Sequence, residues 1–69
     1  MNVQPVASAN VTAVGYDEPS LTLEVHFSSG AIYQYFDLPR STYDDLMNAP
    51  SKGQYFNLYI RNNYRYMRL

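Results

Sequence analysis

The most regular alternation of apolar and polar residues runs from Leu21 to Phe27. Odd-numbered positions are apolar and even-numbered positions are polar, which is the period of two expected for a strand with one buried face. A second segment, Asn10–Tyr16, is rich in residues that favour extended backbone, and the turn-forming residues 17–20 separate it from the first. These two segments predict neighbouring antiparallel strands.

The turn at residues 28–30 sets the register of the hairpin that follows. A three-residue loop that ends with Gly30 in the left-handed conformation places Tyr33 and Tyr35 on the apolar face. A two-residue loop would instead turn Gln34 inward. We favour the three-residue loop because it avoids burying an amide. The predicted partners are Val25 with Tyr33 and Leu23 with Tyr35.

Two short helices are expected after the strands. The first, over Pro39–Asn48, begins where proline suits the first turn, and Pro50 stops it. Ser51-Lys52-Gly53-Gln54 resembles a capping box and begins the second helix, which is expected to continue to about Tyr64 or Tyr66. On a helical wheel its apolar face comprises Tyr55, Phe56, Tyr59, Ile60, Tyr66 and Met67, and its polar face comprises Asn57, Arg61, Arg65 and Arg68.

The pattern therefore predicts an α+β fold, a three-stranded antiparallel meander followed by two short helices packed on one face, in the order β-β-β-α-α. The 69 residues are enough for one domain and too few for two. Residues 1–8, which include Pro5, are expected to form a loose N-terminal arm, and residues 9–69 the domain itself.

Composition restricts the chemistry more than the fold. Tyrosine accounts for 8 of the residues, and tyrosine suits both a core that must bury large rings and a binding surface. The chain has no cysteine, so disulfides and thiol chemistry are excluded. No segment resembles a signal peptide or a membrane span, so we expect a cytoplasmic protein.

The charges are few but unevenly placed. The net charge is −1, which argues against bulk electrostatic binding to nucleic acid. All six acidic residues lie between Asp17 and Asp45, whereas four of the five basic residues lie from Lys52 onward. The last third of the chain is therefore locally basic, and a small anionic ligand suits it better than a long polymer.

Four motifs along the chain together resemble a known family. They are Val14-Gly15-Tyr16-Asp17, Leu23-x-Val25-x-Phe27-x-x-Gly30-x-x-Tyr33-x-Tyr35, Pro39-x-x-x-Tyr43-x-x-Leu46 and Ser51-x-Gly53-x-Tyr55-Phe56-Asn57-x-x-Ile60-Arg61-x-x-Tyr64. In this order they resemble the KTSC domain, over roughly Ser8 to Tyr64. The resemblance implies a domain that occurs at the C-terminus of some lysyl-tRNA synthetases or as a free-standing bacterial or phage protein. It defines no molecular activity, and it suggests RNA only by association.

Candidate ligand-binding residues gather around the start of the second helix. Free backbone N–H groups at Ser51-Lys52-Gly53 would attract a phosphate, although a simple helix cap explains the same residues. Arg61 would contact a phosphate or a base, or else pair with an acidic residue within the fold. The predicted site comprises Ser51, Lys52, Gly53, Asn57, Arg61 and Tyr64.

Catalytic residues are not predicted. The single histidine, His26, falls on the polar face of a strand, and the adjacent Asp44 and Asp45 point in different directions on a helix, so neither a metal site nor a cofactor is expected. We therefore expect a non-catalytic binding module for a small phosphorylated ligand or RNA. The alternative is a protein–protein interaction module, or a homodimer or larger homo-oligomer that sequesters a ligand, using an exposed edge strand and an aromatic rim.

Overall fold

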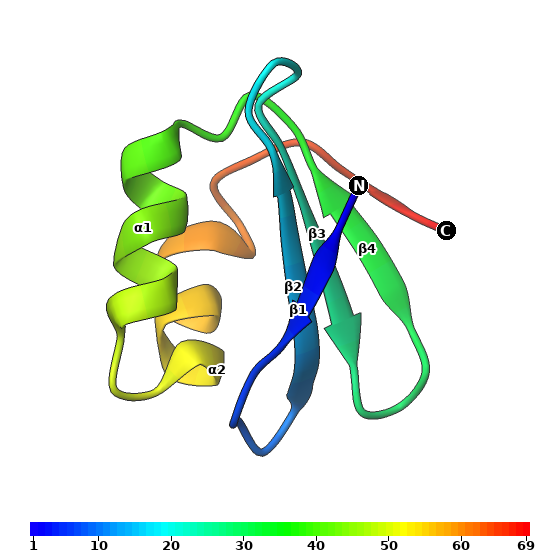
Figure 1. Ribbon diagram of the computed structural model, residues 1–69, viewed down its shortest axis with the longest axis vertical. Coiled ribbons are helices and arrows are strands. Elements are labelled where there is room, and N and C mark those ends of the chain that lie inside the picture. The colour runs from blue at the N-terminus through cyan, green and yellow to red at the C-terminus, as the bar shows by residue number, and fades with distance from the viewer.

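The computed structural model describes residues 1–69, and its helical segments cover one face of a single sheet (Figure 1). The sheet is antiparallel throughout, and its strand order follows the chain, β1-β2-β3-β4-β5. The strands are β1 (Val3–Pro5), β2 (Val11–Asp17), β3 (Thr22–Phe27), β4 (Ile32–Tyr35) and β5 (Tyr66–Arg68). The helical segments are α1 (Arg40–Asn48), α2 (Lys52–Tyr55) and the π-helix η1 (Phe56–Ile60), all between β4 and β5 in the chain.

The β3–β4 hairpin has the predicted register. Tyr35 lies opposite Leu23 and Tyr33 lies opposite Val25. Gly30 has a φ of 93°, the left-handed conformation that a three-residue loop requires of its last residue. The choice against burying Gln34 is therefore confirmed, and both tyrosines lie on the face that the helices cover.

The α+β class is confirmed, but the expected number of three strands is wrong, because the sheet has five. The strand β1 lies within residues 1–8, which were expected to be a loose arm, and it pairs with β2. The strand β5 pairs with β4. Both added strands have only three residues, and all of these residues are exposed, so neither contains the alternation that marks a half-buried strand.

The second helix also differs from expectation. It becomes a π-helix after α2, and it ends before Asn62 and Asn63 rather than near Tyr64. Asparagine favours a helix end, and the Asn63 side chain donates to the Tyr59 carbonyl at 2.8 Å. The wheel placed Tyr59 on the apolar face by assuming regular α-helical spacing, yet Tyr59 is 55% exposed. Neither helical region has the length and apolar character needed to cross a membrane.

The core lies between the helices and the inner face of the sheet. The central strands β2 and β3 supply four of its aliphatic residues, and η1 covers them with Phe56 and Ile60. Leu46 is the buried residue of α1, as the pattern predicted, while Tyr43 and Met47 pack at the margin. The buried hydrophobic residues are Val11, Val14, Leu23, Val25, Tyr35, Leu38, Leu46, Phe56 and Ile60.

Candidate functional site

A groove opens where the helices leave part of the sheet uncovered. We call it the Arg61 groove; its volume is about 690 Å³, within the range of roughly 300–1,000 Å³ usual for small-molecule sites. Its walls come from β4, β5, the β3–β4 turn and the region from α2 to the end of η1. One concave surface therefore brings together residues 10–11, the β3–β4 hairpin, the region from α2 to Asn62 and β5.

Two arginines make the Arg61 groove cationic. Arg61 follows η1 and Arg68 belongs to β5, and none of the 15 lining residues is acidic. The four ion pairs of the chain involve other basic residues: His26 with Glu24, Arg40 with Glu18 and Asp44, and Arg65 with Asp37. The charges of Arg61 and Arg68 are thus not neutralised within the chain, and the groove favours an anion.

Tyrosine rings form the sheet side of the Arg61 groove. Tyr33 and Tyr35 of β4 lie beside Tyr66 of β5, with ring centroids 5.8 Å from Tyr66 in both cases. Arg68 lies over the Tyr33 ring, 5.9 Å from its centroid, which is a cation–π distance. Because these four residues occupy paired positions on adjacent strands, the sheet presents three rings and one guanidinium to the same side.

Tyr35 connects the Arg61 groove to the core. Tyr35 is only 3% exposed, and the Phe56 ring packs edge-on against it with the two ring centroids 5.3 Å apart. Burial raises the pKa of Tyr35 to about 12, an effect that the nearby Arg61 guanidinium partly opposes. Its hydroxyl makes no hydrogen bond within the chain, and it is not a fully enclosed atom. The hydroxyl therefore remains available to a ligand in the groove.

The helical wall depends on the unusual geometry of η1. The Arg61 N–H donates to the Phe56 carbonyl at 2.9 Å, an i→i+5 bond that widens the helix here. Such π-helical turns occur frequently at functional sites. Asn57 and Arg61 lie on the groove side of this segment, as does Gly53 of α2. Three of the six predicted site residues therefore line one groove.

The other three predicted residues lie outside the Arg61 groove. Ser51 caps α2, since its hydroxyl accepts from the Gln54 N–H at 3.3 Å. The Lys52 ammonium donates to the Ala49 carbonyl at 3.4 Å. The Tyr64 hydroxyl lies 3.3 Å from the Thr42 hydroxyl and ties the chain after η1 to α1. Each of these three side chains makes a contact within the fold.

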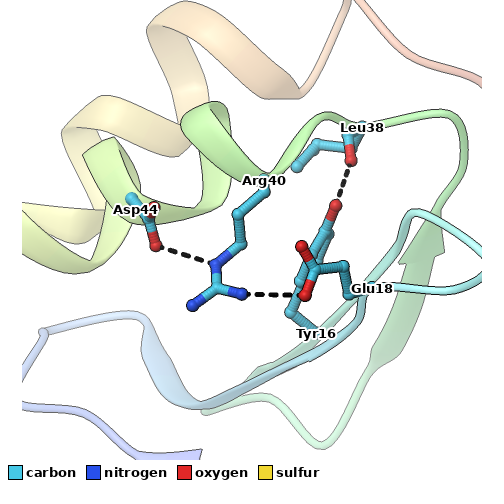
Figure 2. Close-up of polar contacts among 5 residues, drawn as sticks. All are labelled: Tyr16, Glu18, Leu38, Arg40 and Asp44. Carbon is cyan, nitrogen blue, oxygen red and sulfur yellow. Dashed lines mark hydrogen bonds and ion pairs between the residues drawn. The ribbon is translucent and has the colours of Figure 1, made fainter.

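The surroundings of Arg40 contrast with the Arg61 groove, because this arginine has two acidic partners. Figure 2 shows Arg40 between Asp44 of its own helix and Glu18 of the β2–β3 turn. The guanidinium lies 3.1 Å from each carboxylate. Nearby, the Tyr16 hydroxyl donates to the Leu38 carbonyl at 2.7 Å. These bonds join α1 to the sheet and satisfy the charge of Arg40, so we regard this cluster as structural.

Sequence reasoning missed several residues of the Arg61 groove. Arg68 and Arg65 were assigned to one polar stripe of a helix. In the structure Arg68 belongs to the strand β5 and Arg65 directly precedes it. Arg65 pairs with Asp37 at 2.8 Å. Tyr66 was expected on a buried helix face and lies exposed in β5. The Asn62-Asn63 pair was the available signal, because it favours a turn and would have ended the helix earlier. Other lining residues that were missed are Asn10, Ser28, Ser29 and Asn62.

The chain is similar to known proteins in sequence and in structure. A family model described as the KTSC domain matches residues 7–64. A lysine–tRNA ligase of Nostoc punctiforme is 44% identical over 54 residues, which cover 78% of this chain and 10% of the ligase. The chain thus spans about a tenth of the length of the synthetases that it matches. The similar region of these relatives is their C-terminal part.

Other relatives have nearly the same length as this chain. A protein of Tsukamurella paurometabola is 36% identical over 63 residues, which cover 91% of this chain and 94% of that protein. The crystal structure of a KTSC domain protein from Yersinia pestis has a TM-score of 0.96 and 31% identity, with 99% of this chain and 96% of that chain covered. The fold therefore occurs both as a small free-standing protein and as an appended module.

Proposed function

This chain belongs to the KTSC domain family, and from that premise we propose that it is a non-catalytic module whose Arg61 groove binds a phosphate-bearing ligand, a nucleotide or RNA. One observation carries the proposal: Arg61 and Arg68 face an aromatic groove without an acidic partner, whereas Arg40 and Arg65 are paired. The lysine–tRNA ligases that contain a similar segment add an association with RNA. A cytoplasmic location is part of the proposal, since nucleotides and RNA are found there.

The wall chemistry supports such a ligand. Guanidinium groups pair with phosphate oxygens, and tyrosine rings stack on bases irrespective of sequence. The net charge of −1 favours a mononucleotide or a short single-stranded segment over a long duplex. The site is thus expected to contact few phosphates and to bind with a shallow dependence on salt.

The test is a binding titration of nucleotides and tRNA against the full chain by isothermal titration calorimetry. We expect binding that weakens with added salt and is lost in a folded Arg61→Ala variant. Arg40→Ala is the matched control, because it also removes an exposed arginine but not one in the groove. Absence of any nucleotide or RNA binding at high micromolar concentration would overturn the proposal.

A second candidate is an interaction module or a sequestering homo-oligomer. The observation that favours it is β5, an edge strand whose neighbourhood exposes large apolar residues: Tyr66 at 60%, Met67 at 53% and Leu69 at 60%. An unpaired strand edge of this kind readily pairs with another chain. Light scattering that shows a strict monomer, together with no captured partner, would count against this candidate.

A further inference from the structure

The strand β5 contributes an exposed wall of the Arg61 groove. Its Tyr66 and Arg68 lie on the groove side, opposite Tyr35 and Tyr33, whereas Met67 between them points to the other face of the sheet. No helix covers this end of the inner face, because η1 packs its own Phe56 and Ile60 side chains against the core of the sheet. The groove side of β5 therefore remains open.

Tyr66 combines contacts to neighbouring rings with high exposure. It lies 5.8 Å from both Tyr33 and Tyr35, yet 60% of the residue is exposed. The neighbouring rings hold one part of Tyr66 in place and leave the rest free. A ring that is positioned on one side and free on the other is a suitable surface for a flat aromatic ligand.

We propose that a nucleobase stacks on Tyr66 and that β5 is the base-recognising element of this groove, while Arg61 and Arg68 hold the phosphate. This inference rests on the proposed function and specifies the ligand as a base joined to a phosphate. Free nucleotides and single-stranded RNA both supply that unit. The strand β5 lies beyond residue 64, where the family match ends, so the proposed stacking surface lies outside the matched segment.

The experiment separates the base from the phosphate. Ribonucleoside monophosphates, ribose 5-phosphate and a short single-stranded oligoribonucleotide are titrated against the full chain and its variants by calorimetry. In Tyr66→Ala we expect nucleotide binding to weaken by about tenfold or more, as loss of one base stack predicts, with ribose 5-phosphate binding unchanged. Tyr66→Phe, which keeps the ring, is expected to bind like the parent chain.

Tyr59→Ala is the matched control, since Tyr59 is also exposed, at 55%, but does not line the Arg61 groove. If Tyr66→Ala fails to fold by near-ultraviolet circular dichroism, Tyr66→Leu keeps apolar bulk without a π-face and is expected to show the same selective loss. Binding of mononucleotides identifies a free nucleotide as the source, and binding of the oligoribonucleotide alone identifies RNA.

The outcomes distinguish the two proposals. Equal affinity for nucleotides and ribose 5-phosphate, or unchanged nucleotide binding in Tyr66→Ala, overturns base stacking while leaving the phosphate site intact. Absence of binding by every probe overturns the proposed function and this inference together.

Discussion

Tyr35 and Tyr66 face each other across the β4–β5 pairing with their ring centroids 5.8 Å apart, yet their exposures are 3% and 60%. The difference arises because Phe56 covers Tyr35, while η1 does not extend over Tyr66. Both tyrosines line the Arg61 groove, but only Tyr35 also belongs to the core. The tyrosines of this chain therefore serve both roles that the sequence left open: some fill the core and others line an exposed groove.

The buried tyrosine predicts a loss of stability in alkali. Burial raises the pKa of Tyr35 to about 12, against an ordinary value of 10.0, so the unfolded chain releases this proton first. Its contribution to stability is complete below pH 10 and is lost as the pH rises toward 12. In Tyr35→Phe this dependence should be reduced, as urea unfolding across that range would measure. An unchanged alkaline profile would show that Tyr35 ionises normally in the folded state.

Glu24 is expected to make the stability of the fold depend on pH in acid, where stability should fall as the pH falls. Hydrogen bonds from His26 at 2.7 Å and Gln34 at 2.9 Å lower the pKa of Glu24 below its ordinary value of 4.5. The stabilisation is therefore present above pH 4.5 and is lost as the pH falls through the lower folded-state pKa. Glu24→Gln should lose less stability than the parent chain in this acid range, measured by urea midpoints at several pH values. Parallel profiles for the two chains would contradict the prediction.

Two glycines should respond to alanine in opposite ways. At Gly15 a Cβ would lie 2.7 Å from a Val3 methyl carbon and 2.8 Å from the Asn2 carbonyl oxygen, so Gly15→Ala should push β1 away and cost about 1–3 kcal/mol. At Gly53 the nearest atom is the Ser8 hydroxyl at 3.4 Å, and alanine favours a helix by up to about 1 kcal/mol over glycine. Gly53→Ala should therefore be neutral or stabilising. Denaturant midpoints measure both, and a fully stable Gly15→Ala would show that β1 is not held against β2.

Ser51→Ala separates the two interpretations of the start of α2. Loss of the hydroxyl that accepts from Gln54 should cost about 1 kcal/mol of stability, as helix caps usually do. Because Ser51 lies outside the Arg61 groove, ligand affinity should remain unchanged at a temperature where the variant is folded. Loss of nucleotide binding in the folded variant would instead place the phosphate at the helix start.

The elements that sequence alone predicted are those that local residues determine. The alternation up to Phe27, the left-handed Gly30 and the Ser51 cap each depend on neighbours within a few residues. The strand β5 could not be predicted in this way, because its pairing with β4 involves residues far apart in the chain. Its three residues also fit a helical wheel, with Tyr66 and Met67 on the apolar face and Arg68 on the polar face.

Only the part of the candidate site that local residues determine could be predicted from the sequence. Asn57 and Arg61 were placed on one surface because they are four positions apart on one helix, and a modest change in helical geometry preserved that proximity. Arg68 and Tyr66 reach the same groove only through sheet pairing. Whether Arg61 was structural also depended on distant acids, and the fold pairs four of the six with other basic residues and none with Arg61.

The shortness of β5 has a consequence for the motions of the molecule. This strand has three exposed residues, contributes nothing to the buried core, and is held by pairing along one edge. Segments with so few buried contacts detach from the rest of a protein by local opening, at a free-energy cost well below that of global unfolding. Each detachment would remove one wall of the Arg61 groove, so the measured affinity would be the intrinsic affinity reduced by the fraction of molecules in which β5 is closed.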